Sequence, residues 1–229
     1  MIYTDPRLLS AGLVGGTLSR HEGNMRASEA QTPVYEKLSV PAQRILHFHQ
    51  THSTRIITID SPEAAQQFQQ LPLQEADAWL FTASGWGAAI LTADCVPLFL
   101  WAQDGRAFAL AHCGWRGVVN KLPLLTAQAL RQKVGDTPLQ AWLGPHIQSC
   151  CFEVQQDVAA QFSPANVLHK DGKLFVDLTG EIRQQLYAAG LKPDTIAAPY
   201  YCTCGDKANF FSWRRDHVKE NLLSFIYKP

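Results

Sequence analysis

The chain has 229 residues, 46% of them hydrophobic, a length and composition that suit one globular domain and exclude an intrinsically disordered protein. Its 20 basic and 20 acidic residues leave a formal charge of zero, so no positive field favours binding to nucleic acid or to a membrane surface. No apolar run approaches the ~20 residues of a membrane-spanning helix, and MIYTDPRLLSAG has no signal-peptide pattern, so we expect a cytoplasmic protein.

The predicted elements alternate between strands and helices after a weakly patterned start. Residues 1–43 are expected to be rich in loops, because Gly15, Gly16 and Gly23 interrupt them. Apolar runs and turn signals then predict strands at 55–60, 76–82, 85–94, 139–145, 173–178, 195–202 and 221–228. Helical spacing predicts helices at 62–70, 121–135, 152–162 and 179–190, the last of them capped by Gly190. These elements predict an α/β fold, a single domain over residues 1–229 with a central mixed β-sheet flanked by helices.

The segment VPLFLWAQDGRAFALAHC predicts a β-hairpin that turns at Asp104-Gly105. Counting back from this turn places Pro97 opposite His112. Cys95 then lies just beyond the paired end, diagonal to His112 and close to it in space. The hairpin therefore brings a thiol and an imidazole to one end of a sheet, where side chains can reach a cleft.

A cysteine beside a histidine has three interpretations. The pair can be a buried thiol near a core histidine, the nucleophile and base of a Cys/His enzyme, or part of a metal site. A catalytic zinc ion has three protein ligands and one open position, so the third interpretation requires one more ligand. The segment HFHQTH offers His47, His49 and His52 just before a predicted strand.

Five segments occur in order along the chain: HQTH, LTADCVPL, AHCGWRG, LGPHIQSCCFEV and CTCGDKANFFSWRRD. Together they resemble the YfiH family, also called the laccase-domain or polyphenol-oxidase family, over residues 45–229. The resemblance implies a YfiH-like fold and a zinc ion held by His52, Cys95 and His112, which are also the expected catalytic residues. It implies a zinc-dependent purine nucleoside phosphorylase that cleaves adenosine, inosine and methylthioadenosine, with adenosine deaminase as a side activity. The expected partners are therefore a small nucleoside and phosphate.

The chain departs from the family pattern at several places. Ser53 stands where the family usually has glycine, and Cys113 where it usually has alanine. In LVGGTLSRHEGNMRA, Met25 separates Asn24 from Arg26, whereas the family has an adjacent Asn-Arg pair. The N-terminal segment is thus divergent, and its contacts with substrate are expected to differ.

Three further residues are candidates for binding substrate or phosphate. Arg116 in GWRG can bind an anion through its guanidinium, or it can pair with a structural acid. Asp94 can orient a histidine or a water molecule at the metal, or it can cap the break in its strand. His146 follows a Gly-Pro pair at a strand end, where it can line the cleft or lie in a solvated loop.

The remaining cysteines are interpreted as packing residues. Cys150 and Cys151 are neighbours, and adjacent cysteines rarely bind one metal ion together. Cys202 matches a Cys-Thr pair of the family, whereas Cys204 has no expected counterpart.

Three other functions stay open for the same cleft. Copper-dependent polyphenol oxidation, with copper as the cofactor, needs several His-x-His pairs for a trinuclear centre, and the chain has one, His47 and His49. A metal-free hydrolase would use Cys95 as its nucleophile. An enzyme that edits peptidoglycan precursors would share the motifs of the phosphorylase. The sequence also leaves a monomer and a homodimer open.

Overall fold

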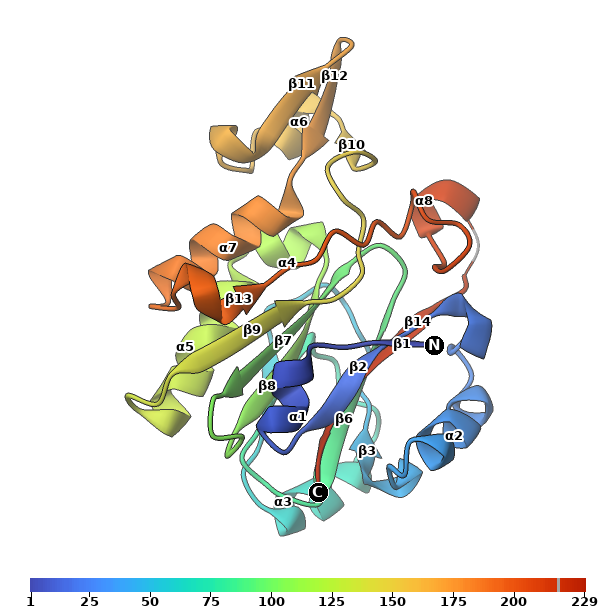
Figure 1. The fold of residues 1–229 in the computed structure, drawn as a ribbon, viewed down its shortest axis with the longest axis vertical. Helices are drawn as coiled ribbons and strands as arrows, with labels where there is room; N and C mark the ends of the chain where they lie inside the picture. The colour runs from blue at the N-terminus through green and yellow to red at the C-terminus, as the bar shows by residue number, and fades with distance from the viewer. Residues whose placement is uncertain (218) are drawn as a thin grey trace.

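Figure 1 shows the structure, a computed structural model that describes residues 1–217 and 219–229. Two larger β-sheets pack against each other, and a small third sheet projects beyond them. The six-stranded sheet has the order β13 (Ile196–Ala197), β9 (Leu139–Leu143), β7 (Val96–Ala102), β8 (Phe108–Cys113), β5 (Ala78–Phe81) and β4 (Ile56–Ile59). The five-stranded sheet has the order β1 (Ile2–Tyr3), β2 (Val14–Leu18), β14 (Leu222–Lys228), β6 (Trp86–Thr92) and β3 (Ile45–Leu46). The small sheet has the order β10 (Glu153–Val154), β12 (Lys173–Val176) and β11 (Val167–Lys170).

Helices lie around the sheets. Their bounds are α1 (Pro6–Ser10), α2 (Ser28–Lys37), α3 (Pro62–Gln69), α4 (Trp115–Val119), α5 (Leu122–Val134), α6 (Gln156–Ala159), α7 (Leu178–Ala188) and α8 (Trp213–Asp216). Local sequence explains where several of them begin: the Ser61 hydroxyl caps α3 ahead of Pro62, and the Asp177 carboxylate caps α7. None of the helices in the described residues is long and apolar enough to cross a membrane.

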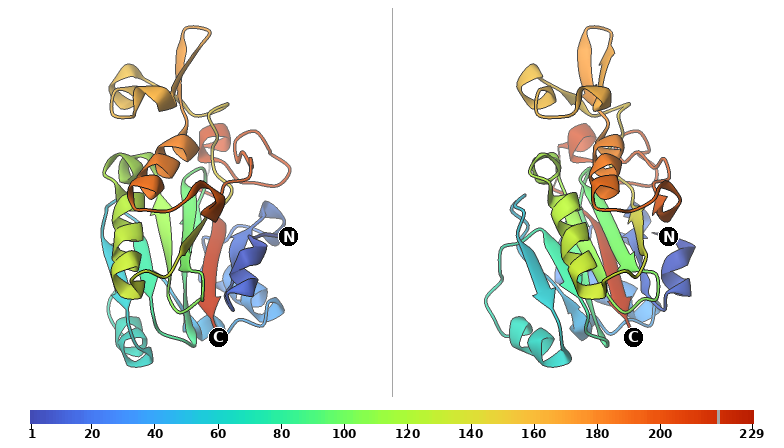
Figure 2. Two further views of the ribbon diagram at one scale, coloured as in Figure 1. Left: turned by 60° about the vertical axis from the view of Figure 1, so that its left-hand side comes forward. Right: turned by 90° about the vertical axis from the view of Figure 1, so that its left-hand side faces the viewer.

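The core lies in layers on both faces of the six-stranded sheet. Along β7, Leu98 and Leu100 face α5 and α7, whereas Phe99 and Trp101 face the five-stranded sheet. On the far side of the five-stranded sheet, α2 covers Phe225 and its neighbours. Figure 2 shows α5 and α2 on opposite sides of the pair of sheets. Because both faces are covered, the strands are apolar at nearly every position, which explains their continuous hydrophobic runs.

The α/β architecture predicted from the sequence is confirmed, with two mixed sheets in place of one central sheet. Each of these two sheets combines antiparallel and parallel pairs: β4–β5 and β13–β9 are parallel in the six-stranded sheet, and β3–β6 is parallel in the five-stranded sheet. The hairpin register is as predicted, since Pro97 lies opposite His112 across β7 and β8. The predicted strand at 85–94 and the first strand of the hairpin lie in different sheets, because β6 belongs to one and β7 to the other.

The expectation of a loop-rich segment at 1–43 is wrong. This segment contains β1, β2 and α2, and β2 pairs with β14 at the centre of the five-stranded sheet. A Cβ at Gly15 would lie 2.6 Å from the Phe225 carbonyl oxygen, and one at Gly16 would lie 2.4 Å from the Tyr3 oxygen. These glycines permit close strand contact, and that requirement depends on partners distant in sequence.

Two predicted elements are shorter or different. In place of the helix expected at 152–162, β10 pairs with β12 and the four-residue α6 follows, because pairing with a distant strand overrides local helix preference. In place of the strand expected at 195–202, only Ile196–Ala197 pairs with β9. Pro199 has no backbone N–H with which to continue that ladder. The strands β10 to β12 and α6 form a small lobe above the sheets, which we call the peripheral lobe (Figure 1).

Candidate metal centre

Cys95 lies where the chain crosses from one large sheet to the other. β6 ends at Thr92 and β7 begins at Val96, so the intervening residues form a bend between the sheets. Asp94 adopts φ +89°, a conformation that is uncommon for a residue with a side chain. This bend places the Cys95 thiol beside the end of β8, where His112 lies.

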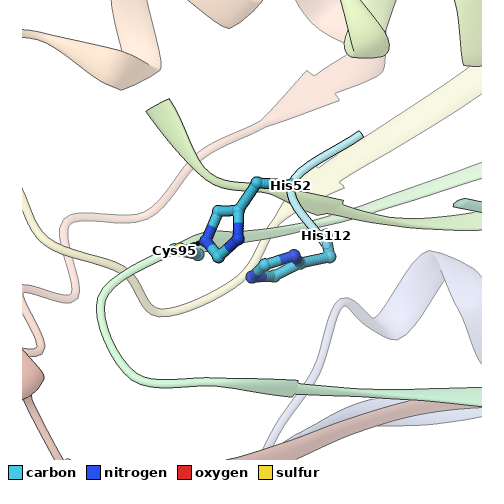
Figure 3. A group of neighbouring side chains, drawn as sticks. All are labelled: His52, Cys95 and His112. Carbon is cyan, nitrogen blue, oxygen red and sulfur yellow. Dashed lines mark hydrogen bonds between the residues drawn. The ribbon is translucent and has the colours of Figure 1, made fainter. Parts of the chain in front are cut away.

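His112 and His52 approach the thiol from two further segments (Figure 3). His112 is buried in β8, and His52 is exposed on the loop before β4, where its backbone adopts φ +60°. The two imidazole rings lie 4.9 Å apart at an angle of 70°. The sequence therefore predicted correctly that Cys95 and His112 would meet, and the structure brings His52 to the same place.

The distances among these side chains suit one metal ion. The Sγ atom of Cys95 lies 3.9 Å from Nε2 of His52, and the potential ligand atoms of all three residues lie within 4.8 Å of one another. A tetrahedral ion with Zn–S of about 2.3 Å and Zn–N of about 2.0–2.1 Å would set sulfur and nitrogen ~3.6 Å apart. The Cys95–His52 separation is thus a few tenths of an ångström wider than such an ion requires, and all three donors are close enough together to surround one ion.

Asp77, which the sequence did not single out, holds both histidines. Its Oδ1 accepts a hydrogen bond from Nδ1 of His112 at 2.8 Å, which leaves Nε2 of that ring free to bind a metal. Its Oδ2 accepts hydrogen bonds from the backbone N–H groups of Thr51 and Ser53 and from the Ser53 hydroxyl, at 3.2, 2.6 and 2.8 Å. One fully buried carboxylate thus orients His112 and fastens the loop on both sides of His52.

In the sequence, Asp77 stands out only as an acidic residue at the start of an otherwise apolar strand segment, ADAWLF. Such an acid has many structural explanations, so its role depended on the fold. Ser53, a departure from the family pattern, has a specific role here, because its hydroxyl adds a hydrogen bond to Asp77 that glycine lacks.

The electrostatics of Cys95 and His112 favour an ion pair. Burial by itself would raise the pKa of the Cys95 thiol, but the charge of His112 and hydrogen bonds with both histidines lower this pKa to about 6. Burial by itself would lower the pKa of His112, but the charge of Cys95 and the hydrogen bond to Asp77 raise it to about 9. Near pH 7 the metal-free pair is therefore a thiolate beside an imidazolium, and an incoming cation displaces the imidazolium proton.

Gly114 has no Cβ and so leaves room for the side chains of His52 and Cys95. A Cβ at this position would lie 2.5 Å from Cδ2 of His52 and 3.1 Å from the Sγ atom of Cys95. The backbone of Gly114 is at φ −66°, which any residue can adopt, so the need for glycine is steric. The glycine of the AHCGWRG segment is therefore explained by its packing against His52 and Cys95.

The three donors open into a cleft of about 1350 Å³, larger than the 300–1,000 Å³ typical of small-molecule sites. The cleft is bounded by the two large sheets, by the start of the peripheral lobe and by α8. Its aromatic and basic lining residues are His47, Phe48, His49, Trp115, Phe152, Trp213, Arg26, Arg116, Arg214 and Lys219. The acidic residues Asp94, Glu153 and Glu220 also line the cleft, so the lining combines flat apolar surfaces with charges of both signs.

The three additional candidates occupy different places around the cleft. Arg116 is exposed and lines the cleft, with its guanidinium 4.4 Å from the centre of the Trp115 ring. Asp94 is buried at the cleft wall and turns its carboxylate toward the C-terminal segment, where the Thr203 and Ser212 hydroxyls and the Arg214 backbone N–H donate to it. These contacts agree with the alternative in which Asp94 secures the break in its strand.

His146 is buried behind the cleft wall, outside the residues that line it. Its Nδ1 lies 2.7 Å from the Gly144 oxygen, and its Nε2 lies 2.9 Å from the Thr179 hydroxyl and 3.0 Å from the Gln148 amide nitrogen. Burial lowers the pKa of His146 to about 4, so the ring is neutral, with Nδ1 donating and Nε2 accepting.

The N-terminal segment contributes to the cleft in part. Arg26 lines the cleft, whereas the side-chain oxygen of Asn24 accepts hydrogen bonds from the backbone N–H groups of Arg26 and Asn221. Met25 between them is fully buried. The two polar residues of the divergent segment thus have separate tasks, one at the cleft and one in holding the chain together.

Comparison with known proteins reveals relatives along most of the chain. The sequence model of the family described as "Multi-copper polyphenol oxidoreductase laccase" matches residues 17–227. A purine nucleoside phosphorylase of Xylella fastidiosa (strain 9a5c) is 35% identical over 189 residues, which cover 79% of this chain and 70% of that protein. Adenosine deaminase RL5 of an unknown prokaryotic organism is 31% identical over 202 residues, 83% of this chain and 77% of that protein. The crystal structure of the Bacillus licheniformis hypothetical protein YfiH matches with a TM-score of 0.84 and 23% identity, over 95% of this chain and 93% of that chain, which shows a common fold.

Proposed function

The chain belongs to the multi-copper polyphenol oxidoreductase laccase family, and from this premise we propose that it is a zinc-dependent purine nucleoside phosphorylase with adenosine deaminase as a side activity. The proposed substrates are phosphate and adenosine, inosine or methylthioadenosine. The observation that carries the proposal is the set of donors from His52, Cys95 and His112, which opens into a cleft large enough for a nucleoside and phosphate together. The names of the curated relatives support the choice of reaction.

The donor set favours zinc over copper. One thiolate and two imidazoles are zinc ligands, and three protein ligands leave a position open, as in catalytic zinc sites. When bound, the ion would supply Lewis acidity at that open position. A trinuclear copper centre needs several histidine pairs, whereas within the described residues only His52 and His112 gather with another donor.

The residues around the cleft can divide the substrate between them. We assign Arg116 to phosphate, because its exposed guanidinium lines the cleft and can form two parallel hydrogen bonds to an oxyanion. The flat faces of Phe152 and Trp213 are suited to a purine base. Asp77 keeps a proton on Nδ1 of His112 and so holds that ring in the tautomer that binds metal through Nε2. Asp94 and His146, in this proposal, position the cleft wall from behind.

We further propose that residues 1–229 act as one catalytic domain in the cytoplasm. A reducing compartment would keep the six thiols of the chain available, including that of Cys95. The mixed charge of the chain, with no excess of basic residues, agrees with a small-molecule substrate.

The function is tested with Cys95→Ala. The purified protein is analysed for zinc and incubated with adenosine and phosphate, and we expect adenine and ribose-1-phosphate as products. In Cys95→Ala, the centre loses its thiolate, so the rate of phosphorolysis is expected to fall by at least ~100-fold. Mutation of a residue that only hydrogen-bonds to a metal ligand already lowers metal affinity or activity by about 10–100-fold. Inosine formed in the absence of phosphate would report the deaminase activity.

Cys113→Ala serves as the matched control. Cys113 is the next residue after His112 but faces the core between β8 and the helices, so this variant is expected to keep zinc at the centre and its activity. Zinc-loaded wild-type protein that turns over none of the three nucleosides would contradict the proposal.

A metal-free hydrolase is the rival that one observation favours, because the low pKa of Cys95 beside His112 is also what a thiol nucleophile needs. Removing zinc with a chelator distinguishes the hydrolase from the zinc-dependent phosphorylase. Activity that persists after zinc is removed, and that iodoacetamide abolishes, would establish the hydrolase. Activity that disappears with zinc and returns when zinc is restored would exclude it.

A further inference from the structure

Four cysteines gather on the side of the molecule where the chain leaves β9 and later approaches α8. Cys150 and Cys151 lie in the turn after β9, and Cys202 and Cys204 lie in the segment before α8. None of these four cysteines is among the described residues that line the cleft. The prediction that they are packing residues fails for Cys150, which is exposed to solvent.

Three of the thiols lie at the mutual distances of metal ligands. The Sγ atom of Cys150 is 3.3 Å from that of Cys151 and 3.5 Å from that of Cys202, and all three sulfur atoms lie within 4.8 Å of one another. A tetrahedral ion with Zn–S of about 2.3 Å would set its sulfur ligands ~3.8 Å apart. The two separations from Cys150 are a few tenths of an ångström below this value, so a small outward shift of the thiols would admit the ion.

The local backbone explains how two adjacent cysteines face the same point. In a strand, neighbouring side chains point to opposite faces, but Ser149, Cys150 and Cys151 form a turn. The turn closes through hydrogen bonds from the N–H groups of Cys151 and Phe152 to the Gln148 oxygen, at 2.9 and 3.0 Å. The usual objection to neighbouring cysteines as ligands of one ion therefore does not apply here.

The second segment is held firmly beside this turn. The N–H of His146 donates to the Tyr201 oxygen at 3.2 Å, and the N–H of Thr203 donates to the His146 oxygen at 3.0 Å. The Gly205 N–H donates to the Sγ atom of Cys202 at 3.3 Å, which holds this side chain in place. The sulfur atoms are therefore brought together before any ion arrives.

We propose that Cys150, Cys151 and Cys202 bind a second metal ion, a thiophilic d10 cation such as zinc, separate from the ion at His52, Cys95 and His112. Three thiolates are soft donors that select zinc or copper(I) over magnesium or calcium. A water molecule would complete a tetrahedron. The ion would join the turn after β9 to the segment that leads into α8, and α8 carries Trp213 and Arg214 to the cleft. Its role is structural, and it fixes one wall of the cleft.

The test removes the other centre first. Protein with Cys95→Ala is loaded with zinc, dialysed and analysed, and we expect one ion per chain to remain. Cys150→Ser is then added, at an exposed position where the substitution does not disturb the core. Because it removes a direct ligand, the affinity for the retained zinc ion is expected to fall by at least ~100-fold. Cobalt(II) in place of zinc gives a sulfur-to-cobalt absorption band, which is expected with Cys95→Ala alone and lost when Cys150→Ser is added.

Ser149→Ala in the Cys95→Ala background is the control, since it changes the same turn and leaves every thiol in place; it is expected to retain the ion and the band. Two results would overturn the proposal. One is a zinc content that Cys150→Ser does not change. The other is a disulfide between Cys150 and Cys202, found by mass spectrometry in protein purified with reductant, which would consume the ligands.

Discussion

A single buried carboxylate connects the parts of the candidate centre. Asp77 accepts hydrogen bonds from Nδ1 of His112 and from Thr51 and Ser53 on either side of His52. It therefore sets the tautomer of one histidine and the position of the other. Its own pKa is lowered: burial opposes this, but the hydrogen bonds from His112 and Ser53 outweigh it. Asp77 is a positioning residue, because no atom of it is a proposed ligand.

Asp77→Asn should weaken the centre without removing a ligand. An amide can replace the shape of the carboxylate but not its charge, so the zinc affinity is expected to fall by about 10–100-fold. In metal-free protein, loss of this charge lowers the pKa of His112 and so raises the pKa of Cys95 from about 6. The pH at which iodoacetamide half-maximally modifies Cys95 is thus expected to move upward.

The control is Asp60→Asn, which removes an exposed carboxylate that pairs with Lys133. Neither zinc affinity nor the pH profile of alkylation should change in that variant. An unchanged pH profile in Asp77→Asn would show that Asp77 has a purely structural role.

At the scale of elements, the β7–β8 hairpin positions two of the donors. Its turn at Gly105 adopts φ +69° and packs against the end of α1, where a Cβ would lie 1.8 Å from the Ala11 oxygen. The turn therefore fixes the register that sets Pro97 opposite His112, and it also holds the hairpin against the N-terminal segment.

Gly105→Ala should destabilise the protein more than Gly12→Ala does. Both glycines have positive φ, +69° and +72°, so both substitutions incur about 1–2 kcal/mol of backbone strain. A Cβ at Gly105 would overlap the Ala11 backbone, whereas a Cβ at Gly12 meets nothing within 4 Å. Overpacking should therefore add about 1–3 kcal/mol to the loss of stability in Gly105→Ala alone. Urea unfolding of the two variants measures the difference, and equal losses would contradict the steric argument.

At the scale of the whole molecule, the candidate centre lies where the two large sheets meet. Cys95 belongs to the bend between β6 and β7, His112 to β8 and His52 to the loop before β4. Because the proposed ligands come from three segments that are distant in sequence, binding of an ion would require the assembled fold. Zinc binding should therefore stabilise the folded state as a whole.

Zinc at 100 times its dissociation constant is expected to add about 2.7 kcal/mol to the free energy of unfolding. Thermal unfolding with and without zinc measures this, and His52→Ala is the comparison, because an exposed side chain can be removed without loss of core packing. Zinc should raise the melting temperature of the wild-type protein more than that of His52→Ala. Equal rises in the two would show that this centre does not bind the ion.

Local pattern predicted the elements whose residues interact mainly with their neighbours. The helix at Pro62, the turn at Asp104-Gly105 and the approach of Cys95 to His112 all follow from short-range rules of capping, turn geometry and register. The order of motifs indicated the family, which the match over residues 17–227 confirms.

What the sequence by itself determined, then, was the set of strands and helices in most of the chain, the pairing of Cys95 with His112, and the family. Only the tertiary structure decided that the strand at 85–94 and the first strand of the hairpin belong to different sheets, that Asp77 holds both histidines, and that Cys150 meets Cys202. The physical reason is that hydrogen bonds and packing within a segment act over a few residues, whereas these contacts join residues that come close only when the sheets assemble.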